Sequence, residues 1–497
     1  MSKLQSLFRD TVLYGLSSIV GRFLNYMLVP LYTHTMTAES GNYGIVTNVY
    51  AWTALLLALL TFGFETTFFR FANKSGADVP KVLSMSLQVV GTLCAVFLCA
   101  VFFNIDSVAA LLDYSEHPEF VTMMAVVVSL DAVQAILFGY IRYKKRPLRF
   151  VGLKLLFIFM SIAMNLIAFL LLPYLYMQNP EGYSFFNPDN QAYYIFLINL
   201  ICTSSITLFL VPELSIYRPT ADKKLLKDML SYSWPLLLLG LAGILNLHAD
   251  KIIYKWLVPG EAGEIQLSIY GAVVKIAAIM AMLMQAFRFA YEPLVFDSGK
   301  DNKESKEYQA KAMKYFVAIS LLAFLAVVLY MDILRYLIGR DYWEGLNVVP
   351  LVMLGEIFMG ISFNLSFWYK LNDETWWGAI FSFTGCAVLL AVNILFVPEY
   401  GYMACGYASM LGYFTAMSLS YIVSRWRSPI NYDLKSLFAY AALAGVLYLI
   451  STFLPAGEEN MWLRLGVNTV LILIYIGYFI KRDIPLKQLP VINRFFR

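Results

Sequence analysis

Runs of about 20 apolar residues recur from one end of this sequence to the other, and each is long enough to cross the hydrocarbon of a lipid bilayer as one helix. The connections between the runs are short, so no segment is left to form a separate soluble domain. The pattern predicts an all-α integral membrane protein with about fourteen transmembrane helices, which start near residues 11, 43, 82, 119, 150, 192, 230, 267, 312, 347, 376, 402, 436 and 461.

The composition supports a lipid environment and argues against several function classes. Hydrophobic residues make up 60% of the chain and charged residues only 14%, whereas a soluble protein carries about a quarter charged residues. The net charge of +4 is too small to indicate a nucleic-acid partner. The five cysteines lie inside apolar runs, and neither they nor the three histidines have metal-ligand spacing. We therefore expect no catalytic group, no metal site and no cofactor, and we do not expect an enzyme.

The placement of lysine and arginine predicts the orientation in the membrane. The connections at 142–149 and 300–314 are strongly cationic, whereas those at 104–119 and 173–191 are neutral or acidic. Cationic connections stay in the cytoplasm. This alternation predicts a multi-pass protein with both termini in the cytoplasm.

The sequence repeats itself at a nearly constant offset. Tyr43 in NYGIVTNV and Tyr270 in IYGAVVKI are 227 positions apart, and Asn165 and Asn393 are 228 apart. This offset covers six predicted helices, so both copies enter the membrane from the same side, as in alternating-access transporters built from parallel repeats. We expect two six-helix parallel repeats, an N-lobe at 1–220 and a C-lobe at 221–430, followed by two extra C-terminal helices and a cytoplasmic tail at 431–497.

Arg22 lies in the middle of the first apolar run, where an unpartnered charge costs about 2.5–3.5 kcal/mol. Adding the repeat offset of 228 to residue 22 gives residue 250, which is Asp250 in the seventh run. The first and seventh runs therefore carry opposite charges at matching positions. Helices related in this way face each other across the central cleft of a two-lobed transporter. We expect Arg22 to face a water-filled cleft, with Asp250 as its counter-ion.

Further cations lie in the seventh and eighth predicted spans, at Lys251, Lys275 and Arg288. Cations outnumber acids around the expected cleft, which suits a substrate that carries phosphate. Two other lysines, Lys154 and Lys255, are predicted to lie at the membrane interface with their ammonium groups in water.

Acidic and amide side chains inside the spans are candidates for counter-ions or for coupling transport to an ion. Asn246 and Asp250 share one helix face at i,i+4 spacing, and they are candidate Na⁺ ligands together with Asn393. Glu356 and Asp131 are candidate proton carriers. The sequence leaves both coupling ions open.

The segment PLYTHTMTAESGNYG (Pro30–Gly44) resembles the first-loop signature of the polysaccharide biosynthesis membrane proteins, in the O-antigen flippase (Wzx-like) branch of the multidrug/oligosaccharidyl-lipid/polysaccharide exporter superfamily. His34 stands where the usual signature has arginine. The segments Ala249–Ile276 and Leu346–Ser409 are also similar to this family, as are the two extra helices.

The resemblance implies a bilobed transporter that moves undecaprenyl-pyrophosphate-linked oligosaccharide from the inner to the outer leaflet through a cationic central cleft by alternating access. Arg22 and Arg288 would meet the pyrophosphate, with Lys251 and Lys275 in support. Membrane lipid and proteins of glycan polymerisation and export would be its partners in O-antigen and lipopolysaccharide synthesis.

Three other readings stay open. A lipid II flippase has the same fourteen spans. A drug or cation antiporter of the same superfamily should have twelve spans and a more acidic cleft. A membrane glycosyltransferase or polymerase would need catalytic carboxylates in a large outer loop, and the outer connections here are short.

Overall fold

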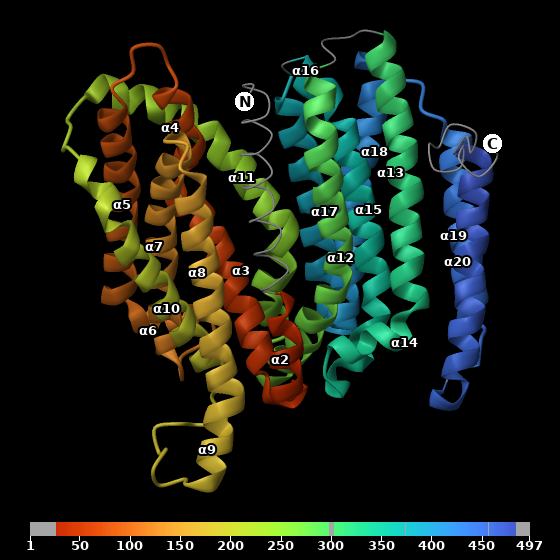
Figure 1. The fold of residues 1–497 in the computed structure, drawn as a ribbon, viewed down its shortest axis with the longest axis horizontal. Helices are drawn as coiled ribbons and strands as arrows, with labels where there is room; N and C mark the ends of the chain where they lie inside the picture. Colours follow the sequence, from red (N-terminus) through yellow and green to blue (C-terminus); the bar gives the residue numbers. More distant parts are fainter. Residues whose placement is uncertain (1–25, 298–302, 373, 456, 484–497) are drawn as a thin grey trace. The chain divides into compact units, whose positions relative to one another are not determined.

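The computed structural model describes residues 26–297, 303–372, 374–455 and 457–483 (Figure 1). Within these ranges the chain forms helices and no strands, and 12 helical segments are long and apolar enough to cross a membrane. The predicted all-α, multi-pass membrane architecture is confirmed.

Two of the predicted spans are not among these 12 segments. The first one begins ahead of residue 26, and most of it lies outside the described residues. The other is α18 (Tyr402–Arg427), a helix of 26 residues whose glycines, serines and tyrosines lower its mean hydropathy. Its length still suffices to cross a bilayer, because a helix rises about 1.5 Å per residue.

The described chain packs into two compact units. Unit 1 is Met1–Ala272 with Val397–Gly401, and unit 2 is Val273–Phe396 with Tyr402–Arg497. The lobes expected at 1–220 and 221–430 rest on sequence repeats, which is a different criterion, and they stay a prediction.

Unit 1 is a bundle in which α3 packs against both α7 and α11, while α7 also packs against α5 and α10 (Figure 1). Its helices are α2 (Leu28–Thr35), α3 (Asn42–Thr61), α4 (Phe64–Ala72), α5 (Val79–Phe103), α6 (Ile105–Leu111), α7 (Pro118–Tyr143), α8 (Pro147–Leu166), α9 (Leu172–Gln178), α10 (Gln191–Leu210), α11 (Lys223–Leu257) and the first part of α12 (Glu261–Asp297). The 3₁₀ segments η1 (Ala38–Ser40) and η3 (Val211–Ile216) and the π-turn η2 (Ile167–Leu171) connect them.

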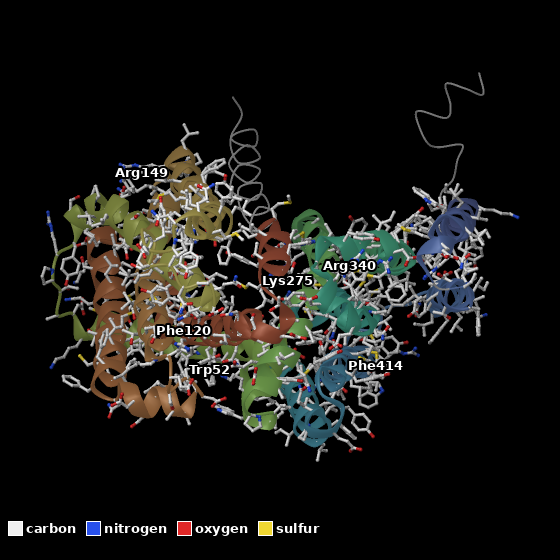
Figure 2. The ribbon with its side chains drawn as sticks, turned by 90° about the horizontal axis from the view of Figure 1, so that it is seen from below. Trp52, Phe120, Arg149, Lys275, Arg340 and Phe414 are labelled. Atoms are coloured by element: carbon white, nitrogen blue, oxygen red, sulfur yellow. The ribbon has the colours of Figure 1, made fainter. Side chains whose placement is uncertain are left out.

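Aromatic and aliphatic side chains fill the space between these helices. Phe64 and Phe68 of α4 and Ile136 of α7 are fully buried in one apolar cluster. Phe120 of α7, labelled in Figure 2, packs edge-on against Phe196 of α10, with 5.2 Å between ring centroids. Removal of this apolar surface from lipid and water makes α7 the best-buried span of the unit.

The direction of the chain changes at two residues between α3 and α4. Phe62 has φ 50° and Gly63 has φ 70°, both in the left-handed region. A Cβ at Gly63 would lie 3.0 Å from the Cβ of Leu236 on α11. Glycine is therefore favoured at residue 63 by both the backbone conformation and the neighbouring helix.

Asp222 fixes the start of α11 as an N-cap. Its carboxylate accepts hydrogen bonds from the backbone N–H groups of Lys224 and Leu225, each at 3.0 Å. The Nζ of Lys81 at the start of α5 lies 2.7 Å from the same carboxylate. The hydrogen bond from Lys81 is the main reason why the pKa of Asp222 is lowered.

Unit 2 is organised around α15, which packs against α18 and α13. Its elements are the rest of α12, α13 (Lys303–Leu329), α14 (Met331–Leu334), η4 (Arg335–Leu337), η5 (Arg340–Val348), α15 (Val349–Leu365), α16 (Phe367–Leu371), α17 (Trp376–Tyr400), α18, α19 (Leu434–Thr452), η6 (Glu458–Asn460) and α20 (Met461–Asp483). Gly385 and Gly412 allow α17 and α18 to approach closely, since a Cβ on either would lie within 2.9 Å of the other's carbonyl oxygen.

The two C-terminal helices α19 and α20 lie side by side and pack on α13 (Figure 1). Asn468 donates a hydrogen bond to the carbonyl oxygen of Leu329 at 2.7 Å. The hydroxyl of Tyr475 donates a hydrogen bond to the carbonyl oxygen of Ala318 at 2.9 Å. At the other end, Asp483 pairs with Lys314 and accepts a hydrogen bond from Tyr440. Polar contacts at both ends thus fix the pair to one helix of the unit.

The two repeated Tyr-Gly segments lie next to each other inside unit 1. A Cβ at Gly44 of α3 would lie 2.1 Å from the carbonyl oxygen of Glu264, and one at Gly271 would lie 2.2 Å from Oγ1 of Thr47. The backbone N–H of Gly44 donates to Oγ of Ser268 at 2.6 Å. Small residues thus let the start of α3 and the start of α12 meet backbone to backbone.

We predict that Gly44→Ala destabilises the protein by about 1–3 kcal/mol, because the added methyl group forces α3 away from α12. Thermal unfolding of the purified, detergent-solubilised protein measures this as a lower Tm. Gly91→Ala on α5 is the matched control, since nothing lies within 4 Å of a Cβ there; its Tm should be unchanged or slightly higher. Equal Tm values for the two variants would contradict the close contact.

Candidate functional site

The predicted site residues are divided between the two units. Asp131, Asn246, Asp250 and Lys251 belong to unit 1, whereas Lys275, Arg288, Glu356 and Asn393 belong to unit 2. Arg22 lies outside the described residues, so its pairing with Asp250 stays a prediction. Each group is therefore described within its own unit.

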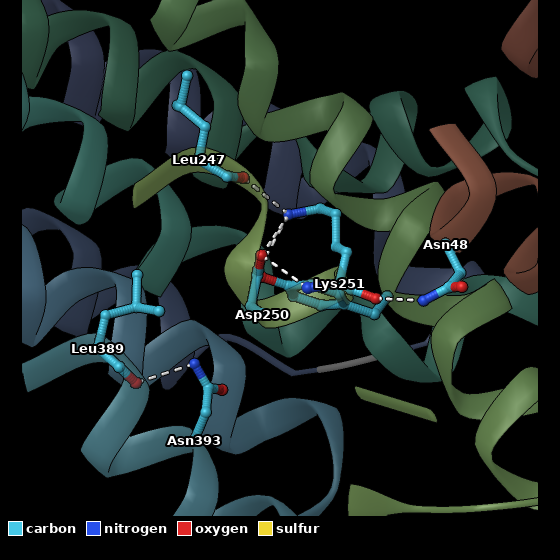
Figure 3. Close-up of polar contacts among 7 residues, drawn as sticks. Asn48, Leu247, Asp250, Lys251, Leu389 and Asn393 are labelled. Carbon is cyan, nitrogen blue, oxygen red and sulfur yellow. Dashed lines mark hydrogen bonds and ion pairs between the residues drawn. The ribbon is translucent and has the colours of Figure 1, made fainter. Parts of the chain in front are cut away.

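Asp250 is buried on α11 and has two partners, of which Figure 3 shows Lys251. The Nζ of Lys251 lies 2.9 Å from its carboxylate, and the hydroxyl of Tyr270 on α12 donates a hydrogen bond to it at 2.5 Å. The same ammonium group lies 5.1 Å from the centroid of the Tyr270 ring. Lys251 thus neutralises the carboxylate of Asp250 inside the bundle, and the hydroxyl of Tyr270 holds this carboxylate to α12.

Lys251 also marks the place where α3 meets α11. Its carbonyl oxygen accepts a hydrogen bond from Nδ2 of Asn48 at 2.7 Å (Figure 3). Oδ1 of Asn48 accepts one from the hydroxyl of Tyr114 at 3.0 Å. Desolvation by burial raises the pKa of Tyr114 well above its usual value, so this phenol stays a donor.

Asn246, one turn before Asp250, donates to the carbonyl oxygen of Ala242 at 2.7 Å.

The ammonium group of Lys255 does not lie in water, and that part of the expectation is wrong. Its side chain is 2% exposed, and its Nζ lies 2.8 Å from Oε1 of Glu264 and 3.4 Å from Oδ2 of Asp113. It also donates to the carbonyl oxygen of Asp113 at 2.8 Å and lies 3.8 Å from the ring centroid of Tyr114. Lys255 joins the segment before α7 to the start of α12, because two carboxylates and one aromatic ring replace the water that it loses.

Asp131 lines a cavity of about 390 Å³ inside unit 1, together with Glu65, Arg142 and Lys154. Arg142 forms an ion pair with Glu65. Sequence reasoning missed this cluster, because Arg142 was grouped with the cationic connection that follows it and Glu65 was left unassigned. The signal was available, since Asp131 and Arg142 occupy one helical stripe that also includes Gln134.

In unit 2 the predicted residues occupy three different helices. Lys275 and Arg288 are exposed on α12 and lie about 20 Å apart along its axis; Figure 2 marks Lys275. The guanidinium of Arg288 lies 5.1 Å from the ring centroid of Phe363. Because of this separation, Lys275 and Arg288 cannot both contact one phosphate group at the same time.

Glu356 lies half-buried on α15, while Asn393 is fully buried on α17. Asn393 donates to the carbonyl oxygen of Leu389 at 3.0 Å (Figure 3). Its Oδ1 has no hydrogen-bond partner within the described part of the chain. A buried amide oxygen of this kind is available to a cation or a water molecule.

Comparison with known proteins gives one family match. The family model described as polysaccharide biosynthesis protein matches residues 7–298. No curated protein matches the sequence significantly.

Two solved structures illustrate the likeness of fold. A lipid II flippase MurJ in an inward closed conformation is 12% identical, has a TM-score of 0.71, and covers 95% of this chain and 99% of its own. An inward-facing multidrug resistance MATE family transporter of the MOP superfamily is 15% identical, has a TM-score of 0.60, and covers 87% of this chain and 99% of its own. At such identities the likeness is one of fold, and it agrees with the predicted fold class.

We predict that Lys255→Met destabilises the protein by about 1–3 kcal/mol, because Glu264 and Asp113 then lose their cation while keeping partial access to solvent. The double variant Lys255→Met with Glu264→Gln should lose less than the sum of the two single variants, as measured by Tm. Lys224→Met, at an exposed lysine on α11, controls for the loss of a charge. Strictly additive effects would mean that the Lys255–Glu264 pair has no energetic role.

Proposed function

Because the chain belongs to the polysaccharide biosynthesis protein family, we propose that it is a flippase for a lipid-linked oligosaccharide. In this proposal the substrate is an undecaprenyl-pyrophosphate-linked glycan, carried from the inner to the outer leaflet of a bacterial inner membrane. The observation that carries the proposal is the family match over residues 7–298. The shared fold with a lipid II flippase adds support.

The physical task explains why such a protein needs charges inside the membrane. A pyrophosphate cannot enter hydrocarbon without its counter-charges, and a long polyprenyl chain cannot leave hydrocarbon. A cationic cleft that opens alternately to either face would meet both demands. With both termini in the cytoplasm, Arg22 and Arg288 would contact the pyrophosphate, supported by Lys251 and Lys275.

The energy source belongs to the same proposal. Moving one charge across 100 mV is worth about 2.3 kcal/mol, so two negative charges leaving a negative interior gain roughly twice that. Coupling to Na⁺ would use Asn246, Asp250 and Asn393, and coupling to H⁺ would use Glu356 or Asp131. Because the ammonium of Lys251 already sits on Asp250, Na⁺ binding there would require Lys251 to move.

Two alternatives have an observation in their favour. The TM-score of 0.71 to a lipid II flippase supports lipid II as substrate. The TM-score of 0.60 to a multidrug transporter supports export of a drug or cation. All three functions use one architecture, so the identity of the cargo decides between them.

We predict that deletion of the gene leaves an undecaprenyl-pyrophosphate-linked oligosaccharide on the inner leaflet, because its export step is missing. Mass spectrometry of extracted lipids, combined with an enzymatic test of leaflet exposure, measures this. Accumulation of lipid II instead would support the first alternative. Drug sensitivity without any accumulated lipid-linked glycan would support the second and rule out the proposal.

We predict that Lys275→Gln or Arg288→Gln lowers the rate of glycan-lipid translocation in proteoliposomes by at least about tenfold, because each removes a charge-assisted interaction worth about 1.5–3 kcal/mol. Lys275→Arg should retain most of the rate. Lys224→Gln, at an exposed lysine at the start of α11, is the control. Unchanged rates in both glutamine variants would remove these residues from the proposed cleft.

A further inference from the structure

The cavity of about 390 Å³ in unit 1 is built from two facing helix stripes. Asp131, Phe138 and Arg142 lie on one face of α7, and Phe150, Lys154 and Phe157 lie on one face of α8. The volume falls in the range of roughly 300–1,000 Å³ that is usual for small-ligand sites. The proposed diphosphate site uses none of these side chains.

Two of the charged groups in the cavity, Asp131 and Lys154, attract each other electrostatically without direct contact. Within the described part of the chain, no hydrogen bond or ion pair joins the carboxylate of Asp131 or the ammonium of Lys154 to another residue. Arg142 pairs with Glu65, but a third of its side chain stays exposed and borders the cavity. The carboxylate of Asp131 therefore borders the cavity as an acceptor, and the cationic groups of Lys154 and Arg142 border it as donors. They lie in a region where a charge is costly unless it is bound by a partner.

The walls between these charges are aromatic. The rings of Phe138 and Phe150 pack edge-on with 5.4 Å between centroids, and the ammonium of Lys154 lies 4.3 Å from the centroid of Phe138. Phe157 continues the same wall two turns after Phe150 along α8. A ligand in this cavity meets flat apolar faces and charged hydrogen-bonding groups at once.

We propose that this cavity binds a sugar residue of the transported lipid-linked glycan, an inference that rests on the function proposed above. A pyranose has apolar C–H faces that pack on aromatic rings, and its hydroxyls both donate and accept hydrogen bonds. Asp131 accepts from such hydroxyls, while Lys154 and Arg142 donate to them.

Other ligand classes fit the cavity less well. A polyprenyl chain offers no hydrogen bond to the charged groups of the cavity. A metal ion prefers several oxygen ligands, but Glu65 is already bound to Arg142 and the ammonium of Lys154 repels a cation. A sugar is the ligand whose chemistry matches both the aromatic walls and the opposite charges.

The test compares the affinity of the purified full-length protein for farnesyl diphosphate with its affinity for farnesyl-diphosphate-linked glucose, galactose, N-acetylglucosamine and N-acetylgalactosamine. We expect at least one sugar to strengthen binding by about tenfold, through hydrogen bonds to charged groups. Asp131→Asn and Lys154→Gln should remove most of this gain while leaving the affinity for farnesyl diphosphate unchanged, which also shows that the variants are folded.

Asp228→Asn and Lys227→Gln, at exposed positions of α11, are the matched controls and should keep the gain. If no sugar adds affinity, or if the gain survives in both cavity variants, the sugar site is overturned while the diphosphate site stands. If Asp131→Asn and Lys154→Gln keep the added affinity for the sugar but remove an effect of H⁺ or Na⁺ concentration on ligand binding, the cavity serves ion coupling. The sugar site is then overturned. If the wild-type protein binds neither kind of ligand, the proposed flippase function fails and the sugar site fails with it.

Discussion

A polar side chain buried between membrane-spanning helices must find its partner inside the protein, because hydrocarbon offers none. This constraint determines most of the specific contacts in unit 1. Asn48 binds a backbone carbonyl group of α11, Asp250 is bound by the phenol of Tyr270, and Lys255 is enclosed by Glu264 and Asp113. Each contact joins segments that are distant in sequence or lie on different helices, so polar groups select which helices become neighbours.

The sequence predicted the helices well, because span length and charge asymmetry are local properties of the chain. It predicted less of the tertiary contacts. Lys255 looked like an interfacial lysine, since one of its acidic partners, Asp113, lies 142 positions away. The Glu65–Arg142 pair escaped notice for the same reason.

The predicted site was partly accessible from sequence. Asp250 and Lys251 were recognised because charges are rare inside apolar runs, and they form a bound pair in the structure. That Lys251 would neutralise Asp250 was not evident, because the repeat offset pointed to Arg22 as its partner. The cavity between α7 and α8 depends on which faces of two helices meet, and hydropathy alone does not fix the rotation of a helix about its axis.

The attachment of α19 and α20 has a practical consequence for spectroscopy. Both helices pack on α13, and Asp483 and Asn468 fasten α20 near its end and in its first turns. A probe on the connection between the two helices, for example at the exposed Phe453, should therefore report the position of α13 rather than an independent motion of α19 and α20. The pair is therefore a suitable place for labels that follow unit 2 by distance measurements, and none of its residues is assigned to cargo binding.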